Sequence, residues 1–281
     1  MAQEIDDVDE GVERLRRFLH AAGPLGTITL SGAGLSTESG IPDYRGPSGA
    51  LRRHAPMNYH AFVTDAAARH RYWARSYLGW PQIARARPNA GHRAVAALQE
   101  AGALSGVITQ NVDGLHQEAG ARDVLELHGG LDRTVCLDCG HRASRRELHE
   151  RLRAANPGFG AAVDEVNPDG DVEMPDAELV GFRMVDCRPC GGGPLKPDVV
   201  FFGENVPKDR VERCYQLVEA AGAVLVLGSS LTVLSGFRFV RHAARHAIPV
   251  AIVNQGATRG DPLAALCVDA ALGQVLPALV G

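Results

Sequence analysis

Lysine, long apolar runs and an excess of positive charge are all scarce or missing in this sequence. Lysine occurs only at Lys196 and Lys208, and the chain carries a net charge of −4 at pH 7. Proteins that bind nucleic acid directly usually display a basic surface, so we expect no nucleic-acid partner. No stretch reaches the roughly 18 uninterrupted apolar residues of a membrane-spanning helix, so we also expect no membrane partner.

A targeting segment is lacking at the start of the sequence as well. Residues 1–15, MAQEIDDVDEGVERL, are acidic and contain no apolar core, unlike a secretory signal or a transit peptide. We therefore expect a cytoplasmic protein. Its 281 residues, of which 45% are hydrophobic and 22% charged, have the ordinary composition of a globular protein.

Residues 26–46, GTITLSGAGLSTESGIPDYRG, contain only part of the G-x-G-x-x-G dinucleotide-binding fingerprint. The β-prone residues 27–30 run into a turn at Gly32 and Gly34, where backbone N–H groups and the start of a following helix can approach a phosphate. The third glycine of G-x-G-x-x-G is absent, because Thr37 stands there, and residues 50–54 contain no acid for a ribose. The pattern predicts nucleotide binding but disfavours a hydride-transferring dehydrogenase.

Strand and helix patterns alternate along the rest of the chain. A first helix carries Val12, Leu15, Leu19 and Ala22 on one face. We predict strands at residues 27–30, 106–109, 124–127, 199–203, 223–227, 250–253 and 270–272, and helices at residues 66–78, 92–99, 208–220 and 236–246. Repeated strand, turn and helix units are typical of an α/β fold with a doubly wound, Rossmann-like parallel sheet.

Two insertions in this pattern predict a second, smaller domain. We assign residues 1–46, 88–130 and 197–281 to the Rossmann-like domain. Residues 47–87, a helical insertion, and residues 131–196 would form the small domain. We expect the ligand cleft between the two.

Four of the six cysteines form two C-x-x-C pairs, each followed by a glycine that permits a turn. They are Cys136, Cys139, Cys187 and Cys190. Two such pairs complete a four-thiolate shell, so they predict one structural zinc, although the 47 intervening residues exceed the usual spacing of about 15–20. A redox dithiol is the alternative for either pair.

Polar residues follow several predicted strands, at the edge where open α/β sheets bind ligands. The strand that ends at Thr109 is followed by Gln110-Asn111-Val112-Asp113, and the next strand by His128. Two later strands are followed by Gly228-Ser229-Ser230 and by Asn254-Gln255-Gly256. Because a histidine in this position has an ordinary pKa of about 6.5, we expect His128 to act as a general base.

The chain resembles the sirtuins, the NAD-dependent protein deacylases. The resemblance lies in GAGLSTESGIPDYRG at 32–46, TQNVDGLH at 109–116, LHG at 127–129, the paired cysteines, PDVVFFGE at 197–204, GSSL at 228–231 and VN at 253–254. These blocks cover nearly the whole chain in family order. VNPDGDV at 166–172 and LKPDVVFFGE at 195–204 are similar to the class II, mitochondrial lipoamidase-like branch and its bacterial relatives.

The resemblance implies that NAD is a consumed co-substrate and that proteins carrying acyl-lysine are the partners. The amide oxygen of acyl-lysine attacks the carbon that bears nicotinamide, and nicotinamide leaves. A histidine then helps a ribose hydroxyl attack the resulting imidate. The products are lysine, nicotinamide and O-acyl-ADP-ribose.

The resemblance also implies roles for individual residues. The catalytic residues are His128, Asn111 and Asp113. NAD is bound by Gly32, Ala33, Gly34, Ser36, Asp43, Tyr44, Arg45, Gln110, Asn111, Val112, Asp113, Gly228, Ser229, Ser230, Asn254, Gln255, Gly256 and Leu272. The peptide substrate lies against Val200, Phe201 and Gly203 and against Leu231 with the residues that follow it up to 235, which pair with it as strands.

Tyr72 and Arg75 match a Tyr-x-x-Arg pattern of sirtuins that remove acidic acyl groups, so we expect them to line an acyl pocket. Two other functions share the same blocks of sequence. The site could transfer ADP-ribose to a protein, or the chain could be a non-catalytic NAD-sensing module. The retention of His128, Asn111 and Asp113 argues against loss of catalysis.

Overall fold

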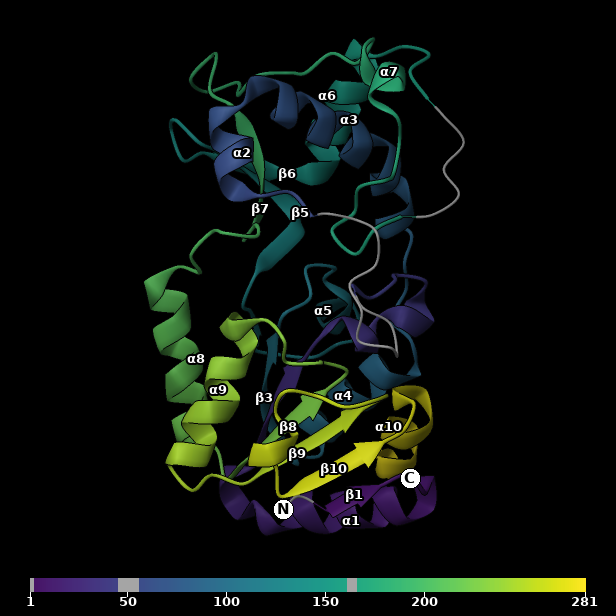
Figure 1. Ribbon diagram of the computed structural model, residues 1–281, viewed down its shortest axis with the longest axis vertical. Coiled ribbons are helices and arrows are strands. Elements are labelled where there is room, and N and C mark those ends of the chain that lie inside the picture. The colour runs from purple at the N-terminus through teal and green to yellow at the C-terminus, as the bar shows by residue number, and fades with distance from the viewer. Residues whose placement is uncertain (1–2, 45–55, 161–165) are drawn as a thin grey trace.

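A seven-stranded, fully parallel sheet forms the centre of the larger part of the molecule in the computed structural model, which describes residues 3–44, 56–160 and 166–281 (Figure 1). The strand order is β1-β10-β9-β8-β2-β3-β4. In chain order the strands are β1 Gln3–Ile5, β2 Thr27–Ser31, β3 Leu104–Thr109, β4 Val124–Glu126, β8 Ala223–Leu227, β9 Val250–Asn254 and β10 Leu266–Asp269.

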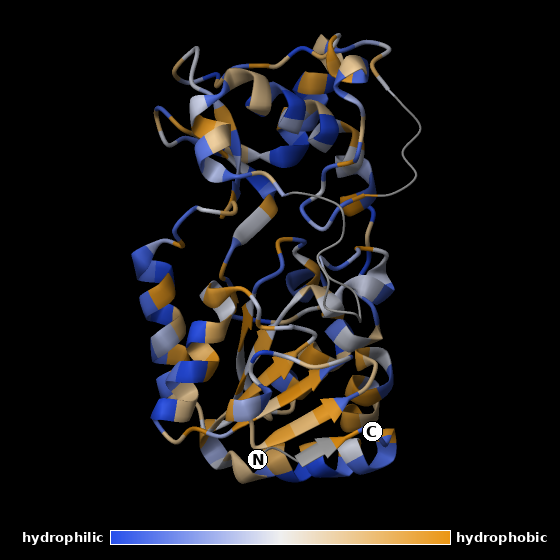
Figure 2. Cartoon of the chain, in the orientation of Figure 1, coloured by the Kyte–Doolittle hydropathy of each residue, from blue (hydrophilic) through white to orange (hydrophobic). Residues whose placement is uncertain are grey.

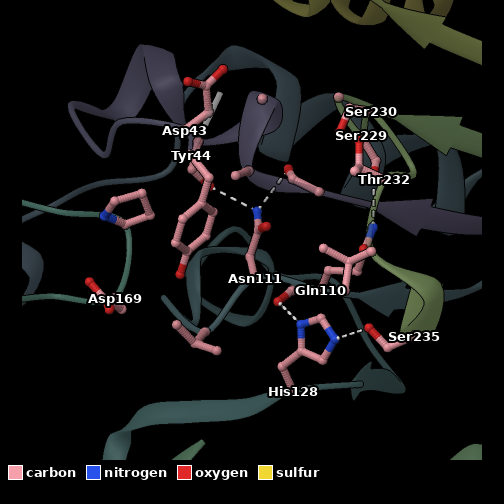
Figure 3. Close-up of a pocket in the computed structure, with 18 of the residues that line it drawn as sticks. Asp43, Tyr44, Gln110, Asn111, His128, Asp169, Ser229, Ser230, Thr232 and Ser235 are labelled. Atoms are coloured by element: carbon pink, nitrogen blue, oxygen red, sulfur yellow. Dashed lines mark hydrogen bonds between the residues drawn. The ribbon is translucent and has the colours of Figure 1, made fainter. Parts of the chain in front are cut away.

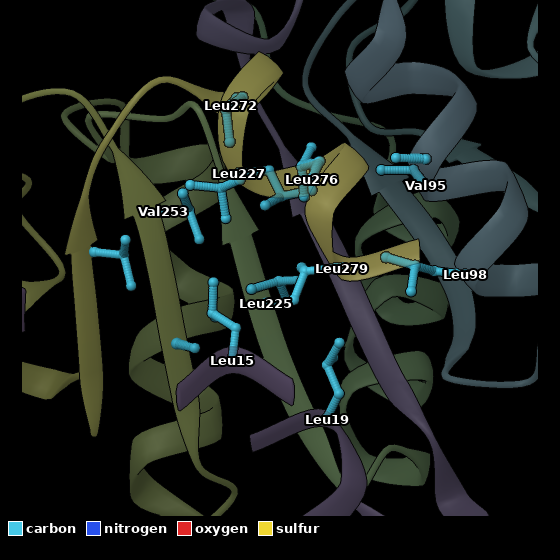
Figure 4. Packing of buried hydrophobic residues seen from close by; sticks show 14 of the residues in the cluster. Leu15, Leu19, Val95, Leu98, Leu225, Leu227, Val253, Leu272, Leu276 and Leu279 are labelled. Carbon is cyan, nitrogen blue, oxygen red and sulfur yellow. The ribbon is translucent and has the colours of Figure 1, made fainter. Parts of the chain in front are cut away.

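Helices cover both faces of this sheet, because its central strands are apolar on both sides. In β8 Leu225 and Leu227 pack toward one face, while Val224 and Val226 pack toward the other. The first face is covered by α1 Val8–Ala21, α4 Ala90–Glu100 and α10 Leu272–Val280, and the second by α8 Lys208–Ala220 and α9 Leu234–Arg245 (Figures 1 and 4). In Figure 2 the strands are the most hydrophobic segments, whereas the helices show polar outer faces.

A second core lies beyond the carboxyl ends of the strands. An antiparallel three-stranded sheet, ordered β6-β5-β7, packs there with short and long helices. These elements are β5 Gly129–Cys136, β6 Arg142–Ser144, β7 Leu195–Val199, α2 Tyr59–Thr64, α3 Ala66–Ile83, α6 Arg145–Ala155 and α7 Asp176–Leu179. The remaining helices are α5 Leu115–Glu118 and the 3₁₀ turns η1 Gly23–Leu25, η2 Ala33–Leu35, η3 Thr37–Ser39 and η4 Asp261–Leu263.

The predicted fold class, a doubly wound parallel sheet with a smaller domain, is confirmed. Three details were wrong. The last strand is β10 Leu266–Asp269, and Leu272 instead begins α10. The expected strand at 199–203 is β7 Leu195–Val199, one of the strands of the small sheet, and the glycine turn leads into two 3₁₀ turns, not an α-helix. The domain boundaries stay a prediction.

Among the described residues, no helix is long and apolar enough to cross a membrane. The longest helix, α3, has 18 residues and contains three arginines.

Candidate active site

A cavity of 440 Å³ lies at the carboxyl ends of β2, β3, β8 and β9 (Figure 3). It collects most of the residues that the sequence pointed to, from segments far apart in the chain. The predicted residues that line it are Gly32, Ala33, Gly34, Ser36, Asp43, Tyr44, Gln110, Asn111, Val112, Asp113, His128, Val200, Phe201, Gly203, Gly228, Ser229, Ser230, Leu231, Asn254, Gln255 and Leu272.

Three predicted residues of the described part of the chain do not line the cavity. Gly256 is not among the residues that line the cavity. Arg45, also predicted to bind NAD, lies outside the residues that the structure describes. Tyr72 is 1% exposed and packs edge to face against Phe62 and against neighbouring aromatic rings of the small domain. Arg75 donates to the carbonyl of Met174 and to the carboxylate of Asp176. The structure therefore does not place Tyr72 or Arg75 in a described pocket.

The glycines after β2 let the turn lie directly on the end of β8. A Cβ at Gly32 would be 2.7 Å from the Cβ of Ser229, and one at Gly34 would be 3.0 Å from the Cα of Gly228. The N–H groups of Gly32 and Gly34 donate to the carbonyls of Leu227 and Gly228, both at 2.9 Å. These two donors are therefore committed to the fold, so the glycines serve close backbone packing as well as any ligand.

Asn111, Ser36 and Asp113 form a hydrogen-bonded group on the cavity wall. The Asn111 amide donates its two hydrogens to the Gly32 carbonyl at 3.0 Å and to Ser36 Oγ at 3.1 Å. Ser36 in turn donates to Asp113 Oδ2 at 2.7 Å, and the Leu115 N–H donates to Asp113 Oδ1 at 2.9 Å. Burial raises the pKa of Asp113, while these two hydrogen bonds act in the opposite direction. What Asn111 can offer a ligand is thus its Oδ1 acceptor.

Gln110 connects two of the strand ends around the cavity. Its Nε2 donates to Ser229 Oγ at 2.8 Å and to the Ser31 carbonyl at 3.3 Å. Across from it, a Cβ at Gly236 would lie only 2.4 Å from Gln110 Oε1, so the start of α9 presses on this side chain. The Gln110 side chain is therefore held in one orientation by β2, by the end of β8 and by α9.

His128 sits between β4 and β5 with both ring nitrogens bonded (Figure 3). Its Nδ1 lies 2.9 Å from the Gln110 carbonyl oxygen, and its Nε2 lies 2.8 Å from Ser235 Oγ. A carbonyl can only accept, so Nδ1 carries the hydrogen and the neutral ring keeps its lone pair at Nε2. The base nitrogen is therefore Nε2.

The expectation that His128 would keep an ordinary pKa was wrong. Burial lowers the pKa of His128 to about 4; the nearby Arg210 and Arg238 also lower it, while the hydrogen bond to Gln110 acts the other way. Among the residues that the structure describes, no carboxylate contributes to this shift. At neutral pH the ring is therefore uncharged and ready to accept a proton, although it is a weaker base than the sequence suggested.

The four paired cysteines meet at the far end of β5. Their Sγ atoms all lie within 4.8 Å of one another, with Cys136–Cys190 and Cys139–Cys187 each at 3.7 Å. Zinc–sulfur bonds of about 2.3 Å place the sulfurs of a tetrahedral site about 3.8 Å apart, whereas a disulfide would bring two of them to about 2 Å. The four-thiolate arrangement therefore fits a zinc ion.

The backbone around these cysteines is shaped to hold their sulfurs. Gly140 and Gly191, the glycines that follow the two pairs, have φ values of 70° and 78°, the left-handed conformation that the knuckle turns need. A Cβ at Gly193 would lie 2.3 Å from Cys136 Sγ. Backbone N–H groups of residues 192 and 193 lower the pKa of Cys190 to about 7, whereas burial and the neighbouring cysteine thiols raise the pKa of Cys187 to about 12, so the donor geometry and not the thiol acidity supports a metal site.

A model of the Sir2 family matches residues 32–235, most of the chain. The chain belongs to the Sir2 family. A Streptomyces coelicolor protein named NAD-dependent protein deacetylase 1 is 58% identical over 270 residues, 96% of this chain and 90% of that protein. A Mycobacterium avium protein of the same name is 52% identical over 255 residues, 89% of each.

Solved Sir2 structures have the same fold. One of Sir2 with a p53 peptide and NAD⁺ matches with a TM-score of 0.74 and 29% identity, over 93% of this chain and 95% of that chain. Another, of Sir2 bound to acetylated peptide, matches with a TM-score of 0.73 and 28% identity, over the same shares of the two chains.

Two segments of this Sir2-family chain contribute many residues to the cavity wall. Residues 199–206 and 228–235 both line it, and the Val200 N–H donates to the His128 carbonyl at 2.8 Å. Three large apolar side chains on these segments remain exposed: Phe202 at 43%, Val233 at 43% and Leu234 at 55%. Exposed apolar side chains beside a cleft are a feature of surfaces that bind another chain.

Sequence reasoning missed several residues of the Sir2-family site. Pro168 and Asp169, from the insertion expected to be a loop-rich excursion, line the cavity close to Tyr44. Burial, followed by the charge of Asp169, raises the pKa of Tyr44. Arg238, on the first turns of α9, also lines the cavity, as does Ser235, which was expected only within the peptide-binding residues 231–235. The Pro-Asp-Gly turn signal was visible in the sequence, but nothing in it revealed which part of the fold this turn would face.

Proposed function

We propose that this protein is an NAD-dependent protein-lysine deacylase. The observation that carries the proposal is His128, a neutral base that lines one cavity together with Gln110, Asn111 and Asp113. Membership of the Sir2 family supports it, because similar proteins are named as NAD-dependent deacetylases. Removal of an acetyl group is the activity with the most direct support from these relatives.

The reaction would use NAD and one water for each acyl group removed. The amide oxygen of acyl-lysine bonds to the ribose carbon as the bond to nicotinamide breaks. A ribose hydroxyl oxygen then bonds to the imidate carbon and gives its proton toward His128. Addition of water and breakage of the carbon–nitrogen bond release lysine and O-acyl-ADP-ribose.

The residues present fit NAD as a substrate. The Asn111 Oδ1 and the Asp113 carboxylate can accept hydrogens from the nicotinamide carboxamide, because the Asn111 amide hydrogens are already used within the protein. Ser229, Ser230 and Ala33 line the cavity at the ends of β2 and β8, where hydroxyl and backbone donors suit the ribose and the pyrophosphate. Asn254, at the end of β9, and Leu272, at the start of α10, also line the cavity and would contact the adenosine.

An acyl-lysine peptide would lie as an extra strand between residues 199–203 and 231–235. Both segments line the cavity, and exposed Phe202, Val233 and Leu234 offer apolar contact. Strand addition is read mainly through backbone hydrogen bonds, so it favours broad tolerance of peptide sequence.

We infer that the four cysteines hold one structural zinc. The sulfur distances and the glycine turns support this inference, as described above. All four positions of a tetrahedral ion would be filled by thiolates, which leaves none for catalysis. The ion would fix β5, which begins directly after His128, relative to residues 187–193 of the small domain.

The acyl preference and the class II branch remain finer proposals. The sequence VNPDGDV at 166–172 supports the branch by its resemblance, and its Pro168 and Asp169 contribute to the cavity wall. Preference for acidic acyl chains, expected from Tyr72 and Arg75, finds no support in the contacts of these two residues.

Mass spectrometry of an acetyl-lysine peptide incubated with the protein and NAD tests the proposal. A deacylase gives the free-lysine peptide together with nicotinamide and O-acetyl-ADP-ribose. An ADP-ribosyltransferase would instead leave ADP-ribose covalently on a protein, and an NAD-sensing module would bind NAD and leave it intact. Absence of deacylated peptide across a panel of acyl groups would overturn the deacylase assignment.

A further inference from the structure

Ser235 is the residue that, in the described part of the chain, hydrogen-bonds to the base nitrogen of His128. The Nδ1 atom is bonded to the Gln110 carbonyl at 2.9 Å, so it cannot accept a proton. The Nε2 atom has a single lone pair, and Ser235 Oγ lies 2.8 Å from it. A substrate hydroxyl therefore meets either Ser235 or the same lone pair after Ser235 has moved away.

The fold holds Ser235 in this place. It is the second residue of α9, a helix anchored by the buried Phe239 and Val240. The next residue, Gly236, lies so close to the Gln110 side chain that a Cβ there would be 2.4 Å from Gln110 Oε1. His128, Gln110 and the start of α9 thus form a closed ring of contacts, and Ser235, which also lines the cavity, points toward His128 (Figure 3).

We propose that Ser235 relays the proton from the substrate hydroxyl to His128. This inference rests on the proposed deacylase function. As the ribose oxygen bonds to the imidate carbon, its proton passes to Ser235 Oγ, and the Ser235 hydrogen passes to His128 Nε2. The electron pair of the carbon–nitrogen double bond moves to nitrogen, Ser235 ends neutral, and His128 ends as an imidazolium.

The Ser235 hydroxyl would also compensate for the low basicity of His128 by stabilising its protonated ring. Arg210 of α8 and Arg238 of α9 are the charged groups that act on the ring, and both oppose its protonation. The Ser235 oxygen can accept a charge-assisted hydrogen bond from the new Nε2–H, and such bonds are stronger than neutral ones. Ser235 therefore stabilises the charged ring as well as passing the proton.

The test compares two chemical steps in Ser235→Ala, Ser235→Thr and His128→Ala. Exchange of labelled nicotinamide into NAD, with acetyl-peptide present, reports the step before the hydroxyl is deprotonated. Formation of O-acetyl-ADP-ribose reports the whole reaction. Ser105→Ala, at an exposed serine near the start of β3, is the matched control.

We expect Ser235→Ala to lower product formation roughly 10- to 100-fold, less than loss of the base itself, because a water can partly replace the hydroxyl. Exchange should stay within about twofold of the parent protein, as should both activities of Ser105→Ala. Ser235→Thr, which keeps the hydroxyl, should retain product formation to within about threefold. The His128→Ala/Ser235→Ala double variant should be no slower than His128→Ala, since both act in one proton path.

Two results would overturn the relay in an active parent protein. Product formation by Ser235→Ala within about twofold of the parent would mean that the hydroxyl contacts His128 directly. Equal losses of exchange and product formation would mean that Ser235 only supports the structure. A parent protein that makes no deacylated peptide would overturn the proposed function, and the relay with it.

Discussion

The Arg75 guanidinium of α3 donates to the Asp176 carboxylate of α7 at 3.1 Å and to the Met174 carbonyl at 2.8 Å. These contacts tie α3 to the segment that returns from the insertion. Asp176 is largely exposed, so its ion pair contributes little by itself. The partly buried bond to the Met174 carbonyl matters more, because its loss would leave that acceptor without its donor.

Substitution of Arg75 by methionine tests which role this residue has. We expect Arg75→Met to lower the free energy of unfolding by about 1 kcal/mol, from the lost bond to Met174. Turnover of acetyl-lysine and succinyl-lysine peptides should change by similar factors. A loss of about 10-fold or more on succinyl-lysine alone would instead restore the acidic acyl pocket that the sequence suggested.

Loss of His128 should remove the base and leave NAD binding intact. We expect His128→Ala to lower turnover on the order of 10²–10⁴-fold, the usual range for a general base. The affinity for NAD, measured by calorimetry, should stay within about threefold, with His20→Ala at an exposed position of α1 as control. Turnover within about twofold of the parent protein would contradict the assignment.

The pH dependence of turnover should reflect the lowered pKa of His128. Because protonation removes the base, activity is lost as the pH falls through the pKa of the ring, and burial has moved that pKa to about 4. The His128 contribution to the rate should therefore be unchanged between pH 7 and about 5. Loss of half the rate near pH 6.5, with the fold intact by circular dichroism, would show an ordinary histidine instead.

Removal of the proposed zinc should unfold the small domain. Metal analysis should give about one zinc per chain, and Cys136→Ala should lose it and lower thermal stability. Cys214→Ala, at a buried cysteine of α8 outside the cluster, should keep the metal and serves as control. A metal-free preparation with full activity and unchanged stability would rule out the structural zinc.

Much of the fold could be predicted from the sequence, because its strands and helices carry strong local patterns. The uninterrupted apolar run of β8 and the helix at Lys208–Ala220 were placed to the residue. The last strand was misplaced because residues 270–272 are as apolar as β10, and only the pairing with β9 decides between them. The glycine turn was expected to lead into an α-helix. Instead, the N–H groups of Gly32 and Gly34 donate to the carbonyls of Leu227 and Gly228 at the end of the neighbouring strand β8.

Site residues could be predicted where the residue type itself indicates the chemistry. Properties that depend on spatial neighbours, such as a pKa or a hydrogen-bond partner, could not. Sequence motifs identified His128 and Asn111 as site residues, and both line the cavity. The pKa of His128 depends on burial and on Arg210 and Arg238, which lie 82 and 110 positions further along the chain. Ser235 has no signature as a partner of His128, because a serine near a helix start is usually a cap.

From two further buried histidines, His92 and His116, we predict that the free energy of unfolding decreases in mild acid. His92 of α4 and His116 of α5 pack edge to face, with ring centroids 5.2 Å apart, and burial lowers their pKa values to about 4 and about 3. Ser31 donates its hydrogen to Thr109, so His116 Nε2 must donate to Ser31 Oγ at 2.8 Å. Both rings are therefore neutral in the folded protein.

The direction of the effect follows from the protons bound in each state. Below the unfolded pKa of about 6.5 the unfolded chain binds protons at these histidines and the folded protein does not. Their contribution to stability is full above about pH 6.5 and is lost as the pH falls toward the folded values, by up to about 1.4 kcal/mol per pH unit for each histidine. Urea unfolding at pH 7, 6 and 5 measures this slope.

Replacement of one histidine should remove its share of the slope. We expect His116→Gln to reduce the change in unfolding free energy between pH 6 and pH 5 by about 1 kcal/mol, whatever its effect on stability at pH 7. His20→Gln, at an exposed position, should leave the slope of the parent protein unchanged. If His116→Gln also kept the parent slope, His116 would titrate equally in the folded and unfolded states, and its burial would not be the cause of acid sensitivity.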